Sequence, residues 1–181
     1  MDDIVKAAQL KWPNVPDCYG WLGLDARGHW CLRDYPAQQA GAFNSRLPGA
    51  RGQRLEHEKL IAFIGRNYEH DAAGRWYFQN GPQRVYVELE AAPWVWRLQP
   101  DGALLSHTGL VASYLGSWLD EQGQLYAETE LGLGLVHSQD MHLAADWVEQ
   151  GRWSPQDCLA AELPQRFGFV LSPQAGASSQ G

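Results

Sequence analysis

The polar side chains best suited to recognise a ligand surround one tight turn near the middle of the chain. The turn is Asn80-Gly81-Pro82, and long polar side chains stand on both sides of it. In a recognition loop of this kind, Arg84 would pair with an anion while amide groups fix the orientation of the ligand. The alternative interpretation is a hydrogen-bonded turn that caps the edge of a sheet. The candidate ligand-binding residues are Arg66, Tyr68, Trp76, Gln79, Asn80, Gln83 and Arg84.

Aromatic residues are the second unusual feature of the sequence. The chain has nine Trp, seven Tyr and five Phe. Large aromatic side chains usually belong to the core. The pairs Trp76/Phe78 and Trp94/Trp96 are expected on adjacent strands, where they would also suit a groove for an apolar or ring-bearing ligand. Both interpretations, core packing and a binding groove, remain open at this stage.

Familiar catalytic motifs are missing from the sequence. His57-Glu58 would begin a zinc-protease helix, but Ile61 occupies the position of the second histidine. Gly132-Leu133-Gly134 lacks the third glycine of a dinucleotide loop, because His137 stands there. There is also no hydrolase elbow and no phosphate-binding loop. We therefore expect no cofactor and no metal site, and we lean towards a protein that is not an enzyme.

Composition and charge exclude several classes of protein. The 181 residues carry a formal charge of −7, whereas a general nucleic-acid binder needs a basic face. No apolar run approaches the roughly 18 residues that a membrane span requires. The first residues are acidic, unlike a signal peptide. Three widely spaced cysteines do not form a disulfide framework, so we expect a cytoplasmic protein.

Periodicity predicts an α+β fold, with helices packed on antiparallel β-meanders. Strict alternation over residues 84–90 is the clearest strand signal, and it belongs to an expected meander of about four strands over 75–107. The other expected elements are helices at 2–11, 54–67 and 139–150, a hairpin at 21–32, strands at 118–135, a short helix from Ser154 and a final strand at 167–171.

A turn of the form Asp-x-x-Gly occurs at Asp25, Asp71 and Asp120. It suits hairpins in general, but it also suggests a weak internal repeat. We expect a single globular domain over 1–171, with related motif halves at 12–110 and 111–171. The small polar residues 172–181 predict a disordered tail.

Two stretches resemble an uncharacterised proteobacterial family that is classed as a domain of unknown function. The first stretch runs from Lys11 to Pro16 and continues through Tyr19-Gly20-Trp21-Leu22. The second runs from Arg66-Asn67-Tyr68 to Gln83-Arg84. The likeness covers nearly the whole chain except the tail, and it implies no activity and no catalytic residues.

A second resemblance is more remote. The order of elements, with Val87-Glu88 followed by Pro93-Trp94, is similar to another uncharacterised family. The members of that family have repeated α/β motifs and have been suggested to act in signalling or ligand binding. This resemblance agrees with the weak internal repeat.

Three functional hypotheses follow from the sequence. The first is a non-catalytic module that binds a small molecule or a protein partner, and it rests on the polar loop around Arg84. The second is an unrecognised hydrolase or isomerase that uses His57, Glu58 or Glu88. The third is a structural protein whose exposed aromatic side chains form a homodimer interface.

Overall fold

The computed structural model describes residues 1–177, and it confirms the α+β class. The chain folds into two compact units. Unit 1 contains Met1–Asp25, His29–Glu90 and the C-terminal residues from Phe169. Unit 2 contains Ala26–Gly28 and Ala91–Gly168. Within the described residues, no helix is long and apolar enough to cross a membrane.

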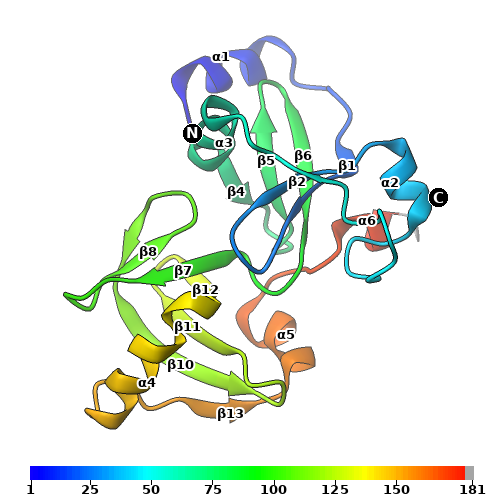
Figure 1. Ribbon diagram of the computed structural model, residues 1–181. Helices are drawn as coiled ribbons and strands as arrows, with labels where there is room; N and C mark the ends of the chain where they lie inside the picture. The colour runs from blue at the N-terminus through cyan, green and yellow to red at the C-terminus, as the bar shows by residue number, and fades with distance from the viewer. Residues whose placement is uncertain (178–181) are drawn as a thin grey trace. The chain divides into compact units, whose positions relative to one another are not determined.

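Unit 1 is built on a six-stranded sheet with the order β3-β2-β1-β6-β5-β4 (Figure 1). All its neighbouring strands are antiparallel except β1 and β6, which run parallel. The strands are β1 (Cys18–Leu24), β2 (Trp30–Leu32), β3 (Gln53–Arg54), β4 (Tyr68–His70), β5 (Trp76–Asn80) and β6 (Gln83–Leu89). The helices of this unit are α1 (Asp3–Lys11), α2 (Tyr35–Ala40), α3 (Glu58–Arg66) and α6 (Pro173–Ala177).

Helix α3 covers part of one face of this sheet. His57 caps its first turn, since the ring Nδ1 accepts a hydrogen bond from Leu60 N at 3.3 Å. Ile64 is buried, and the ring of Phe63 meets the ring of Phe78 edge-on at 5.5 Å. The helix therefore packs on β5 through its apolar stripe, as the helical spacing of the sequence predicts.

The sheet presents two chemically different faces because side chains alternate along each strand. Phe78 pairs with Val85 across β5 and β6, and both lie on the face that α3 covers. Gln79 pairs with Arg84 and therefore lies on the opposite face. This alternation separates an apolar surface from a polar one.

Unit 2 is built on a seven-stranded sheet with the order β13-β10-β11-β12-β7-β8-β9. The buried indole of Trp96 fixes two of its strands together, because Nε1 donates to Ala127 O at 3.0 Å. The strands are β7 (Trp94–Leu98), β8 (Leu104–Ser106), β9 (Val111–Ala112), β10 (Tyr114–Asp120), β11 (Leu125–Thr129), β12 (Gly132–Val136) and β13 (Gln156–Cys158). The helices are α4 (Met141–Glu149) and α5 (Leu163–Phe167), with short 3₁₀ turns at Ser138–Asp140 and Ala160–Glu162.

Both sheets use the same strand-pairing scheme. In unit 1, the hairpin β1-β2 is joined to the meander β4-β5-β6 through the parallel pair β1/β6. In unit 2, the hairpin β7-β8 is joined to the meander β10-β11-β12 through the parallel pair β7/β12. The sheets are therefore mixed, whereas the sequence predicted antiparallel meanders alone.

The structure corrects the expected meander over 75–107. Strands β6 and β7 belong to different sheets, so Trp76 and Phe78 do not lie on a strand adjacent to Trp94 and Trp96. The division between the units falls between Glu90 and Ala91, whereas the expected motif halves met at residues 110 and 111. Pro93 stands in this connection, directly before β7.

The C-terminal part of the chain also differs from expectation. The segment after Pro155 forms strand β13, which pairs with β10, and not a helix. The expected strand at 167–171 is absent, because α5 ends at Phe167 and Gly168 takes a left-handed conformation with φ of 67°.

Part of the expected disordered tail is helical. Helix α6 begins at Pro173, which is buried, and Gln174 N donates to Glu88 Oε1 at 3.0 Å. Because Glu88 is a buried carboxylate, it needs donors, and this segment supplies them. Residues 178–181 of the expected tail lie outside the described part of the chain.

Candidate functional site

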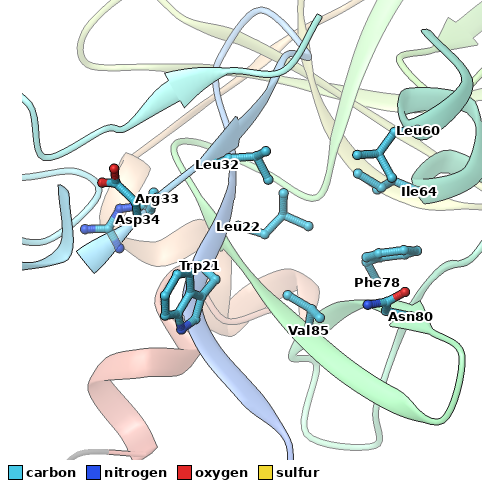
Figure 2. Close-up of a pocket in the computed structure, with 10 residues that line it drawn as sticks. All are labelled: Trp21, Leu22, Leu32, Arg33, Asp34, Leu60, Ile64, Phe78, Asn80 and Val85. Atoms are coloured by element: carbon cyan, nitrogen blue, oxygen red, sulfur yellow. The ribbon is translucent and has the colours of Figure 1, made fainter. Parts of the chain in front are cut away.

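An apolar groove opens on the α3 face of the unit 1 sheet (Figure 2). Its volume is about 420 Å³, which lies within the range of small-molecule sites. Figure 2 shows Leu22 and Leu32 at its centre, with Leu60 and Ile64 of α3 to one side and Trp21 to the other. The complete lining is Trp21, Leu22, Leu32, Arg33, Asp34, Leu60, Ile64, Phe78, Asn80 and Val85.

Large apolar side chains remain exposed at the rim of this groove. Trp21 is 46% exposed and Leu32 is 44% exposed, although both stand on strands of the sheet. The groove therefore has an apolar surface that the described part of the chain leaves open to solvent. Such a surface is typical of a binding site.

Two polar groups at the rim can orient a ligand. The indole Nε1 of Trp21 and the side-chain amide of Asn80 have no hydrogen-bond partner within residues 1–177. Arg33 and Asp34 also line the groove, but their polar atoms are engaged. The Arg33 guanidinium donates to carbonyl oxygens of Gly20, Gly41 and Ala50, and Asp34 Oδ1 accepts from Ala37 N. Trp21 Nε1 and Asn80 Nδ2 are hydrogen-bond donors, which suits an acceptor on the ligand.

A separate polar cavity of about 310 Å³ lies beside the turn that joins β5 to β6. Because Gln79 and Arg84 help to line it, this cavity belongs to the sheet face opposite Phe78. Its remaining lining comes from Pro82 of the β5-β6 turn, from α1 and from the connector that follows α1, residues 12–17. The complete set is Gln9, Trp12, Pro13, Val15, Asp17, Gln79, Pro82 and Arg84.

Arg84 is held in place by tyrosine side chains. Its guanidinium carbon lies 4.8 Å from the ring centre of Tyr77, and Tyr86 also interacts favourably with its charge. Burial lowers the pKa of Arg84, but the interaction with Tyr86 and the nearby negative charge of Asp17 raise that pKa on balance. Arg84 is therefore a fully charged, oriented cation.

The structure disperses the seven residues that the sequence predicted as one site. Gln79 and Arg84 share the polar cavity, whereas Asn80 lines the apolar groove. Gln83 lies beside the connector, where its Nε2 donates to Pro16 O at 3.0 Å.

Three of the predicted residues have other surroundings. Tyr68 and Trp76 are buried, and their rings lie 4.7 Å apart in the core. Burial raises the pKa of Tyr68 well above its usual value. Arg66 pairs with Asp2 at 3.1 Å.

The residues of the enzyme hypothesis have separate roles. His57 and Glu58 are exposed, and His57 caps α3. Glu88 is buried, and it accepts hydrogen bonds from Gln174 N and the Ser172 hydroxyl. No group of three or more His, Cys, Asp or Glu side chains in residues 1–177 is arranged to hold a metal ion.

Sequence reasoning missed most of the groove and part of the cavity. Leu32 and Leu60 are ordinary apolar residues in the sequence, and only the folded sheet shows that Leu32 stays exposed. The sequence does hold a signal for Trp12 and Asp17. Trp12 lies within the family-like stretch from Lys11 to Pro16, and Asp17 directly follows it.

Fold and surface together define a two-unit α+β protein with concave apolar and polar sites on its first unit. The chain belongs to the family described as "Protein of unknown function (DUF2946)", whose sequence model matches residues 1–174. This confirms the resemblance to an uncharacterised family, which supplies no activity. A search of the curated proteins finds no significant match.

Two solved structures are similar to the chain, and both are DUF1285 family proteins, another uncharacterised family. The protein from Silicibacter pomeroyi DSS-3 is 12% identical with a TM-score of 0.48, covering 74% of this chain and 72% of that chain. The protein from Shewanella baltica OS155 is 15% identical with a TM-score of 0.45, covering 70% of this chain and 91% of that chain. At these TM-scores, the likeness supports no argument about function.

Proposed function

We propose that unit 1 is a non-catalytic binding module and that its apolar groove takes a small, largely apolar molecule. The observation that carries this proposal is the 420 Å³ groove, in which Trp21 and Leu32 remain about half exposed. The free donors on Trp21 and Asn80 suit a ligand with a hydrogen-bond acceptor at one end of an apolar body. Binding without chemistry fits a sensing or signalling role.

The groove is large enough to give useful affinity. A ligand that buries about 150 Å² of apolar surface gains about 4 kcal/mol before the costs of association. A groove that is already formed reduces those costs, because few side chains must be ordered on binding. The expected ligand is therefore a compact ring system or a short aliphatic chain.

A cytoplasmic location belongs to the same proposal. The three cysteines are free, and burial raises the pKa of Cys31 to about 11. A thiol with so high a pKa is protonated near neutral pH and reacts poorly. Such cysteines suit a reducing compartment.

A fluorescence titration with anilinonaphthalene sulfonate tests the groove. This probe has an apolar ring system and a sulfonate acceptor, so we expect saturable one-site binding to the full chain. Leu32→Glu places a charge in the groove and should weaken binding by about tenfold or more. The melting temperature of each variant shows whether it is folded.

Leu115→Glu is the matched control. Leu115 is 63% exposed on β10 of unit 2, so the same substitution should leave probe binding unchanged. The proposal is wrong if Leu32→Glu, while folded, binds the probe as well as the unaltered protein does. It is also wrong if both glutamate variants lose binding equally.

A further inference from the structure

The polar cavity carries an inference that is independent of the apolar groove. We propose that this cavity binds a small zwitterion, namely a free amino acid with an apolar or aromatic side chain. The proposal rests on three kinds of group that line one 310 Å³ space: opposite charges, a buried acceptor without a partner, and an apolar wall.

Opposite charges face the cavity without neutralising each other. Arg84 and Asp17 both line it, yet no ion pair within 4.0 Å joins either of them to any residue of 1–177. Arg84 stays oriented by its stacking on Tyr77. A carboxylate on the ligand can pair with Arg84, while an ammonium group of the same ligand pairs with Asp17.

Gln79 supplies a second recognition element. Its side chain is 1% exposed and lines the cavity. The amide Nε2 donates to Gly81 O at 3.0 Å, and Oε1 is buried without a hydrogen-bond partner among residues 1–177. A buried acceptor in this state is costly unless something donates to it. The ammonium group of a zwitterion is such a donor.

Simpler ligands fit this set of groups less well. An inorganic anion would satisfy Arg84, but Asp17 and the Gln79 oxygen would repel it. A simple cation would satisfy Asp17, but Arg84 would repel it. A molecule with both charges matches Arg84, Asp17 and the Gln79 oxygen together, so specificity follows from this arrangement.

The connector supplies the apolar wall. Trp12 is 50% exposed although its indole is large, and Pro13, Val15 and Pro82 stand beside it in the lining. An aromatic or aliphatic side chain can pack against these groups and gain from leaving water. This wall selects amino acids with apolar side chains over those with charged ones.

Isothermal titration of the full chain with L-phenylalanine and L-leucine tests the proposal. We expect saturable binding of at least one of the two. N-acetyl-L-phenylalanine lacks the ammonium charge and L-phenylalaninamide lacks the carboxylate, so each should bind about tenfold or more weakly than L-phenylalanine. Absence of heat from both amino acids at concentrations up to about 10 mM would overturn the proposal.

Two variants locate the site. Arg84→Gln and Asp17→Asn each remove one charge and should weaken binding by about tenfold or more. The amide analogue should lose its disadvantage in Arg84→Gln, because the partner of the missing carboxylate is gone. This last comparison reports on recognition and would not change if the substitution merely loosened the fold.

Arg54→Gln and Asp3→Asn are the matched controls. Arg54 lies on β3 and Asp3 begins α1, and neither lines the cavity. Both should bind the amino acid normally. Equal binding by Arg84→Gln, Asp17→Asn and the two controls would place any amino-acid site elsewhere and would overturn the proposal.

Discussion

Glu88 shows how one buried residue shapes the C-terminal part of unit 1. Its carboxylate is 3% exposed and accepts from Gln174 N, while Gln174 Oε1 accepts from Arg33 at 3.4 Å. Arg33 is also buried, and its other donors reach backbone carbonyls. These groups hold α6 against the sheet through hydrogen bonds. The charges of Glu88 and Arg33 are also close enough to attract each other.

Replacing Glu88 with glutamine should change how stability depends on pH. Burial raises the pKa of Glu88, although hydrogen bonds and Arg33 oppose the rise. The stability that the protonated form contributes is present below the ordinary pKa of 4.5 and is lost as the pH rises through the raised pKa. Urea unfolding should therefore show that Glu88→Gln gains stability relative to the unaltered protein as the pH rises above 4.5. If the two proteins differ in unfolding free energy by the same amount at every pH, the pKa of Glu88 is not raised in the folded state.

Asp140 in unit 2 predicts the opposite trend. Burial raises its pKa, but hydrogen bonds from Arg97 at 2.7 Å and from Leu98 N at 3.0 Å outweigh burial and lower it. The stability it contributes is present above its unfolded pKa of about 3.8 and is lost as the pH falls through the lowered value.

Asp140→Asn tests this residue. We expect this substitution to lower the free energy of unfolding by about 1–2 kcal/mol near pH 7. The difference should shrink as the pH falls below about 4. Urea unfolding at several pH values measures it. A loss that stays the same, or that grows in acid, would show that the carboxylate charge is not what stabilises the fold.

Residue types alone could identify part of the candidate site. The long, positively charged side chain of Arg84 beside the turn suggested ligand recognition. The structure places Arg84 in a cavity with Gln79. The sequence could not show that Gln79 Oε1 is buried without a partner, because this depends on the sheet and the connector together. Tyr68 and Trp76 belong to the core for the usual reason that large aromatic rings gain most from burial.

At the scale of elements, the Asp-x-x-Gly turn is one structure used repeatedly. Asp71 Oδ1 accepts from Ala73 N and Arg75 N, and its hairpin joins β4 to β5. Asp120 Oδ1 accepts from Gln122 N and Gln124 N in the hairpin β10-β11. The glycine of each turn has positive φ, 75° at Gly74 and 77° at Gly123.

Asp120→Ala should destabilise the protein by about 1–3 kcal/mol, because two backbone donors lose their acceptor. Asp120 is also 5% exposed and accepts from the Tyr126 hydroxyl at 3.3 Å. Asp101→Ala is the control, since exposed Asp101 accepts only from Ala103 N in a comparable turn. Thermal unfolding should separate the two variants clearly. Equal effects would mean that the aspartate does not define the turn.

Local elements were predictable where local signals decide them. The helical stripe of α3 and the strand β6 are confirmed, because periodicity follows directly from backbone geometry. The parallel pairs β1/β6 and β7/β12 were not predicted, since they join strands far apart in sequence. For the same reason, the sequence could not show that β6 and β7 belong to different sheets.

At the scale of the whole molecule, the two units share a pairing scheme. Each sheet joins a hairpin to a meander through one parallel pair. The apolar groove and the polar cavity both belong to unit 1, on opposite faces of its sheet. We therefore propose that the ligand sites lie in unit 1, and this proposal is the central claim.

Methyl chemical-shift mapping by NMR tests that claim most directly. The measurement adds anilinonaphthalene sulfonate to the full chain labelled at leucine, isoleucine and valine methyl groups. We expect the largest shifts at groove-lining methyl groups, namely those of Leu22, Leu32, Leu60, Ile64 and Val85. Shifts centred on unit 2, for example at exposed Leu115 and Leu159, would contradict the claim.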